Sequence, residues 1–135
     1  MVSIVKKNQS DVAHCSGTLV TSKHIITQAV CFRLYPKEDF EVILGSDNLS
    51  DSDGWFVEYV ERFNIHKVYQ HPSYNERHKF DVAIIELEDE VTFSRGIFPI
   101  CLPERSTPTN DREGSLVSFA GFGVTEYVNI VCNVS

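Results

Sequence analysis

Five histidines are the side chains of this 135-residue chain best suited to proton transfer near neutral pH. An imidazole activates a hydroxyl nucleophile most effectively when a nearby carboxylate orients it. Two carboxylates, Asp81 and Glu86, stand in the otherwise apolar run Phe80–Leu87 (FDVAIIEL), where burial of a carboxylate without partners would be unfavourable. The histidines are His14, His24, His66, His71 and His78. None has the spacing of a metal site, with His66 and His71 the weak exception, so we expect solvated or locally bonded histidines and no metal.

Cysteines and glycosylation sequons suggest the compartment. The chain has four cysteines, Cys15, Cys31, Cys101 and Cys132, and no C-x-x-C pair, which argues against a zinc or redox site. Three N-x-S sequons begin at Asn8, Asn48 and Asn133. Together they favour a secreted glycoprotein. Residues 1–20 lack the pattern of a signal peptide, so we expect the secreted form to be a longer parent chain.

Composition and charge exclude several classes of function. The net charge is 12 − 19 = −7, which argues against binding to a nucleic-acid backbone. No apolar run is long enough to span a membrane. Apolar residues make up 42% of the chain and charged residues 23%, as in ordinary globular domains, and the length fits one domain.

The chain alternates short apolar stretches with turn-rich loops, which predicts about six or seven strands in a sandwich or barrel. The expected strands are Met1–Val5, Cys15–Val20, Ile25–Thr27, Phe40–Leu44, one or two within Trp55–Tyr69, Val82–Leu87 and Leu116–Ala120. The continuous apolar run Val82–Leu87 suggests a strand buried on both faces. Asn8–Asp11 is predicted as a turn, Ser22–Gln28 could contain a helical turn, and residues 107–115 are predicted as a domain edge.

Three stretches together resemble the trypsin/chymotrypsin-like serine protease family. Cys15–Cys31 (CSGTLVTSKHIITQAVC) is similar to the pattern C-G-G-[ST]-L-[IV] followed by T-A-A-H-C. Phe80–Leu87 is similar to [NY]-D-[IV]-A-L-[LI]-x-L. Phe98–Pro103 (FPICLP) and the later Ala120–Gly123 (AGFG) resemble the family's P-[IV]-C-L-P and G-W-G.

The resemblance implies an all-β, trypsin-like antiparallel β-barrel. The family has two such barrels with a cleft between them, and this chain would supply the N-terminal one. Residues 1–123 would be a partial protease domain with the first barrel and the start of the crossover, and residues 124–135 a divergent tail. The partners implied include the second barrel and an upstream pro-segment.

The resemblance also places the catalytic positions. Family members use a serine nucleophile, a histidine base and an orienting aspartate. The aspartate position is Asp81, whereas Val30 occupies the histidine position between matching Ala29 and Cys31. The serine segment would lie in the second barrel. We therefore expect Asp81 to be a structural remnant that accepts hydrogen bonds from the backbone amides of Ala29 and Val30 and stays ionised.

The family match further implies a disulfide between Cys15 and Cys31. Cys101 resembles the cysteine that ties the family's catalytic domain to an upstream segment, and it could instead pair with Cys132 or remain free. The acidic loop Ser46–Gly54 corresponds to a calcium loop in some relatives, but it lacks the usual glutamates, and we expect a solvated loop.

These observations favour a catalytically inactive protease homologue without cofactors. It would bind proteins, as a decoy or cofactor among the proteases, inhibitors and substrates of an extracellular cascade. The alternative is a truncated form of an active trypsin-like serine endopeptidase.

Overall fold

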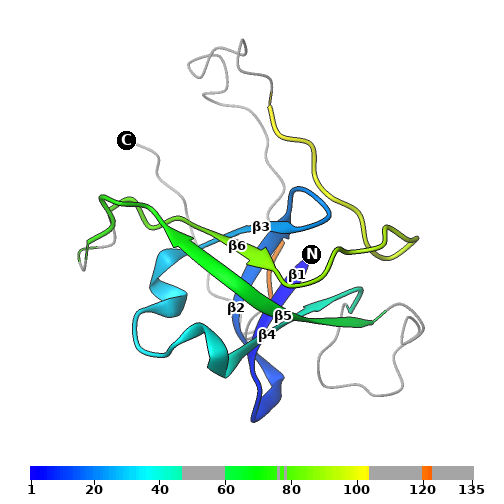
Figure 1. Ribbon diagram of the computed structural model, residues 1–135, viewed down its shortest axis with the longest axis horizontal. Helices are drawn as coiled ribbons and strands as arrows, with labels where there is room; N and C mark the ends of the chain where they lie inside the picture. The colour runs from blue at the N-terminus through cyan, green and yellow to red at the C-terminus, as the bar shows by residue number, and fades with distance from the viewer. Residues whose placement is uncertain (47–59, 76, 78, 104–119, 123–135) are drawn as a thin grey trace, which may run out of the picture.

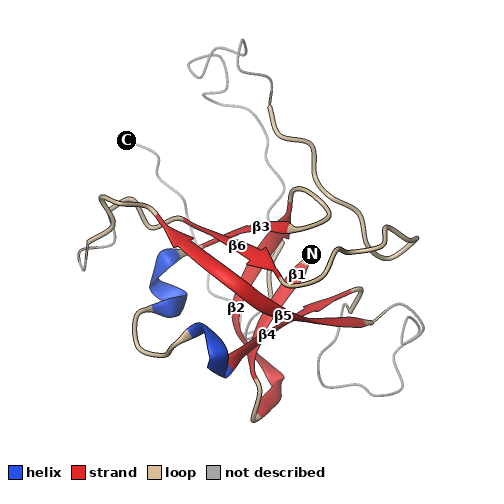
Figure 2. Ribbon diagram, in the orientation of Figure 1, coloured by secondary structure: helices blue, strands red, loops and turns tan. Residues whose placement is uncertain are grey.

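The computed structural model describes residues 1–46, 60–75, 77, 79–103 and 120–122, apart from the side chains of residues 9–11. Most of the regular structure in these residues is β-strand (Figure 2). The strands are β1 Val2–Lys6, β2 Gln9–Leu19, β3 His24–Thr27, β4 Phe40–Leu44, β5 Glu61–Gln70 and β6 Ala83–Leu87. Two short 3₁₀ helices, η1 (Ala29–Phe32) and η2 (Lys37–Asp39), lie between β3 and β4.

The six described strands close into one barrel in the order β1-β2-β3-β6-β5-β4 (Figure 1). Every pairing is antiparallel, and β4 returns to β1 with Val2 opposite Leu44 and Lys6 opposite Phe40. Each of these six strands therefore pairs with two neighbouring strands. The prediction of an all-β antiparallel barrel is therefore confirmed.

The barrel interior is filled by large apolar side chains. Alternate residues of a strand point to opposite faces, so every second side chain enters the barrel. The main cluster comprises Val2, Ile4, Leu19, Ile25, Phe40, Val42, Leu44, Phe63, Ile65, Ile85, Leu87, Val91 and Ile97. A barrel of this size leaves no open channel because these side chains pack against one another.

Strand β6 corrects one prediction. The run from residue 82 to residue 87 is buried on one face only, because Ala83, Ile85 and Leu87 point inward while Val82 is 40% and Ile84 is 41% exposed. In a closed barrel the second face of each strand points outward, and the described residues do not cover this part of β6.

Several predicted boundaries also move. Strand β2 begins at Gln9, within the predicted polar turn, and is much longer than the predicted Cys15–Val20. Residues 24–27 are strand, so the helical turn suggested for Ser22–Gln28 is wrong, and a 3₁₀ turn follows at Ala29 instead. The predicted strand at Leu116–Ala120, the residues at 55–59 and the domain edge at 107–115 lie wholly or mostly outside the described residues.

Glycine at position 17 allows β2 and β3 to approach closely. A Cβ atom there would lie 2.7 Å from Ile25 Cγ2 and 3.2 Å from the carbonyl oxygen of Ile26. Any larger residue would push β3 away from β2, and with it the turn that follows β3.

No helix in the described part of the chain is long and apolar enough to cross a membrane.

Candidate functional site

The candidate site forms where three strand ends meet. In the antiparallel pair β3 and β6, Thr27 lies opposite Ala83, so the residues just after β3 lie beside those just before β6. Gln70 at the end of β5 also lies opposite Ala83, and its Nε2 atom donates to the carbonyl oxygen of Ala29 at 3.4 Å. This pairing brings Val30 and Asp81 together although they are 51 residues apart.

Val30 lies in the 3₁₀ helix η1. Gln28 remains extended, with φ −86° and ψ 141°, and the chain then turns through Ala29–Phe32. The turn closes with a hydrogen bond of 3.1 Å from the Arg33 N–H to the Val30 carbonyl oxygen. Ala29 and Cys31 are buried, so the turn is anchored on both sides of the half-buried Val30.

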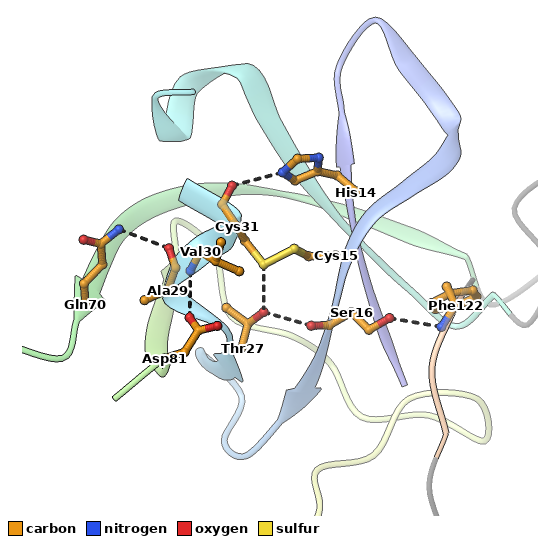
Figure 3. The surroundings of a disulfide bond; sticks show 10 residues. All are labelled: His14, Cys15, Ser16, Thr27, Ala29, Val30, Cys31, Gln70, Asp81 and Phe122. Atoms are coloured by element: carbon orange, nitrogen blue, oxygen red, sulfur yellow. Dashed lines mark hydrogen bonds between the residues drawn. A yellow bond between two sulfur atoms is a disulfide. The ribbon is translucent and has the colours of Figure 1, made fainter. Parts of the chain in front are cut away.

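A disulfide fixes this turn to β2. Cys15 and Cys31 are bonded, with their Cα atoms 6.2 Å apart, as the family resemblance implied. Thr27 adds a second link, because its hydroxyl donates to the carbonyl oxygen of Ser16 at 2.8 Å and lies 3.9 Å from the Cys31 sulfur (Figure 3). Both links hold η1 against the barrel wall.

The Asp81 carboxylate binds the backbone of the same turn. The Val30 N–H donates to Asp81 Oδ1 at 2.8 Å (Figure 3). The predicted amide contact from Val30 is therefore present. An anionic acceptor makes such a bond stronger than one between neutral groups. Asp81 thus stabilises the turn that carries the valine, and Figure 3 shows its carboxylate directed at the Val30 nitrogen.

His14 occupies a different side of the turn. Its Nε2 atom lies 3.0 Å from the carbonyl oxygen of Cys31, and because a carbonyl can only accept, Nε2 must carry the proton (Figure 3). The ring also packs at 4.9 Å from the ring of Phe40. The exposed His14 is therefore held by local contacts, as we expected for the histidines.

Two other described histidines also make local bonds. His24 Nδ1 lies 2.9 Å from the Thr21 hydroxyl. His71 Nδ1 accepts the Ser73 N–H at 3.1 Å. His66 is exposed on β5, and His78 lies outside the described residues.

A cavity of about 240 Å³ lies next to Val30. It is lined by His14, Cys15, Val30, Cys31, Arg33 and Leu34. The valine and the disulfide give it apolar walls, and the imidazole that reaches it has its Nε2 proton committed to a carbonyl group. The cavity can accommodate an apolar side chain, whereas the side chain of Val30 can neither accept nor donate a proton.

The remaining predicted sites are tested less directly. Asn8 is exposed in the turn between β1 and β2, where a glycan would find space, while Asn48 and Asn133 lie outside the described residues. Cys101 is exposed and forms no disulfide, and Cys132 is not described. Most of the acidic loop Ser46–Gly54 is likewise not described, and the described residues contain no group of three potential metal ligands.

Sequence reasoning did not anticipate the contacts that support η1. No feature of the sequence indicated that the Thr27 hydroxyl would bridge β2 and the disulfide. The contact of His14 with Cys31 and that of Gln70 with Ala29 join residues far apart in the chain, and no local pattern signals them. Another contact between distant residues joins Ser16 and Phe122, because the Ser16 hydroxyl accepts the Phe122 N–H at 3.0 Å.

The fold and this geometry define one barrel of the serine protease type, and comparison with known proteins identifies the family. The family model described as Trypsin matches residues 1–132. The chain therefore belongs to the trypsin-like serine protease family. The match passes the predicted boundary at residue 123, and the division into residues 1–123 and a tail of residues 124–135 stays a prediction.

Curated relatives share about a third of their aligned residues with this chain. It is 30% identical over 136 residues to CLIP domain-containing serine protease B4 of Anopheles gambiae, covering 93% of this chain and 38% of that protein. It is 30% identical over 118 residues to a venom serine protease of Polistes dominula, covering 84% of this chain and 41% of the relative. Clotting factor C of Tachypleus tridentatus is 32% identical over 121 residues, covering 83% of this chain and 12% of the relative. The chain thus spans about two fifths of the first two relatives.

Proposed function

We propose that this chain is a catalytically inactive member of the trypsin-like family that acts by binding other proteins. The observation that carries the proposal is the identity and setting of Val30. Valine occupies the position where the family places its general base, and its backbone N–H is bound by the remaining aspartate, Asp81.

An isopropyl group cannot perform the first step of the family's reaction. Attack by a serine hydroxyl on a peptide carbonyl requires a base that removes the hydroxyl proton. Removing one member of such a triad lowers the rate by roughly 10⁴- to 10⁶-fold. Asp81 has no imidazole at position 30 to orient, so we assign it a structural role.

His14 is poorly placed to replace the missing base. Its Nε2 atom donates to Cys31, and its ring packs on Phe40, so recruiting it would break both contacts. The described contacts of His24 and His71 likewise lead to Thr21 and Ser73. These contacts argue against His14, His24 or His71 as a substitute base.

An extracellular location is part of this proposal. The disulfide between Cys15 and Cys31 persists in oxidising compartments, and Asn8 is exposed in a sequon. Two relatives are named as a venom protease and a clotting factor, which are extracellular functions. We propose that its partners belong to extracellular proteolytic cascades. They would be active proteases, their protein inhibitors or their substrates.

A second candidate is an active endopeptidase whose longer parent chain retains the nucleophile and uses a displaced base. Two of the relatives are named as serine proteases, which favours this candidate. The two candidates differ in whether the longest natural form reacts with a serine-directed reagent.

A fluorophosphonate probe separates the candidates. We expect the longest natural form that contains residues 1–135 to remain unlabelled under conditions that label trypsin fully. The variant Val30→His adds the missing imidazole beside Asp81. Labelling of this variant alone would place the defect at Val30, and absence of labelling in both proteins would indicate that the nucleophile is missing too. Labelling of the wild-type protein would overturn the proposal.

Binding is tested separately with purified extracellular serine proteases and their protein inhibitors immobilised on a biosensor. We expect the protein to bind at least one of them reversibly and without cleavage. Absence of binding to the whole panel would contradict a decoy or cofactor role.

A further inference from the structure

The loop between β5 and β6 contains a strained residue immediately before Asp81. Phe80 has φ 56°, in the left-handed region that bulky side chains rarely adopt. This conformation is disfavoured by about 5- to 30-fold relative to the ordinary one. Such strain persists only where surrounding contacts hold the residue.

Backbone hydrogen bonds draw the two ends of this loop together. The His71 N–H donates to the Val82 carbonyl oxygen at 3.0 Å, which closes the loop at its base. The Val82 N–H donates to the Phe80 carbonyl oxygen at 2.8 Å, forming a three-residue turn with Asp81 at its centre. The direction of the Asp81 carboxylate therefore follows from the backbone of Phe80.

Side-chain contacts of His71 then hold Phe80 in place. The two rings are stacked, with centroids 4.9 Å apart and planes 9° apart. Such aromatic pairs are stabilising beyond the area they bury. The imidazole is itself fixed, because its Nδ1 atom accepts the Ser73 N–H at 3.1 Å.

We infer that the stack of His71 on Phe80 is a positioning device for Asp81. It holds Phe80 in its left-handed conformation and so directs the Asp81 carboxylate at the Val30 N–H. His71 and Phe80 are positioning residues in this scheme. They act on η1 through Asp81, and the inference does not depend on whether the parent chain is an enzyme.

The test uses NMR of the isotope-labelled full chain, with the Val30 amide as reporter. The hydrogen bond to Asp81 contributes to the chemical shift of the Val30 amide proton, and the variant Asp81→Asn identifies this contribution, which we call the Val30 response. His71→Phe keeps an aromatic ring but loses the acceptor for the Ser73 N–H. His71→Asn keeps a short polar acceptor for that N–H, as in an Asx turn, but loses the ring.

We expect His71→Phe to retain the wild-type response of the Val30 amide and His71→Asn to lose it. Hydrogen exchange at Val30 should become roughly 2- to 10-fold faster in His71→Asn, which corresponds to loss of one aromatic pair. Amides of the buried pair β1 and β4 should stay unchanged. Phe80→Tyr should behave as wild type. Phe80→Ala removes the ring but keeps the unfavourable left-handed conformation, so it should lose the response, whereas Phe80→Gly adopts that conformation freely and should retain it.

The inference is overturned if His71→Asn or Phe80→Ala retains the wild-type Val30 response and exchange rate. It is equally overturned if His71→Phe loses them, because the hydrogen bond to Ser73 would then be responsible instead of the stack. Both histidine variants alter a loop outside the barrel core, and the β1 and β4 amides report in each sample whether the barrel is folded.

Discussion

Replacing Asp81 by alanine should destabilise the barrel, because the Val30 N–H would lose its charged acceptor. A hydrogen bond to a charged group contributes about 1.5–3 kcal/mol. Asp81 is only half-buried and Val30 is half-buried as well, so solvent screening reduces this to about 1–2 kcal/mol. For a chain of this size the loss corresponds to a fall of roughly 3–8 °C in Tm.

Urea unfolding followed by circular dichroism measures the effect. The midpoint should fall while the slope m stays constant, which separates a loss of stability from a change in the unfolded state. Asp89→Ala is the matched control, because Asp89 is exposed two residues after β6 and its loss should change the free energy of unfolding by at most about 0.5 kcal/mol. Asp81→Asn should be intermediate, since an amide oxygen still accepts. Equal midpoints for Asp81→Ala and Asp89→Ala would refute the structural role of Asp81.

Three further predictions concern the barrel around the site. Replacing Cys15 and Cys31 together by alanine should lower the free energy of unfolding by about 3 kcal/mol, measured in urea against the oxidised wild type, and an unchanged midpoint would contradict the role of the disulfide. Gly17→Ala should lower the free energy of unfolding by about 1–3 kcal/mol in the same assay, because the added methyl group would lie 2.7 Å from a side-chain carbon of β3. Wild-type stability of this variant would contradict the close approach of β2 and β3. The hydrogen bond from Tyr69 lowers the pKa of Glu86, so Tyr69→Phe should raise that pKa in an NMR titration. A lowered folded-state pKa contributes stability above the unfolded-state pKa that is lost as the pH falls, so the two proteins should converge in stability at acidic pH, and an unmoved pKa would contradict the contact.

The sequence predicted the barrel well because its strands carry strong local signals. Phe40–Leu44 was predicted with the bounds that the structure has, since the alternation ends at a glycine. β1 and β6 were each within one residue of their predicted starts. The exposed outer face of β6 was not predicted, because a run of apolar residues does not show which face of the strand points away from the barrel interior.

The site could be predicted in part. The positions of Val30 and Asp81 followed from the family resemblance, and the disulfide followed from the same match. The supporting contacts did not, because Thr27, His14 and Gln70 reach their partners only after the barrel closes. No feature of the sequence predicted the left-handed backbone of Phe80, since phenylalanine seldom adopts that conformation.

The most direct test of the account is a turnover measurement on the longest natural form of the protein, with a peptide library as substrate and mass spectrometry to detect cleaved bonds. The absence of an imidazole at position 30 predicts no cleavage above that of a heat-denatured sample. Cleavage that disappears when His14, or any other single histidine of the chain, is replaced by alanine would show that a substitute base exists and would contradict the account.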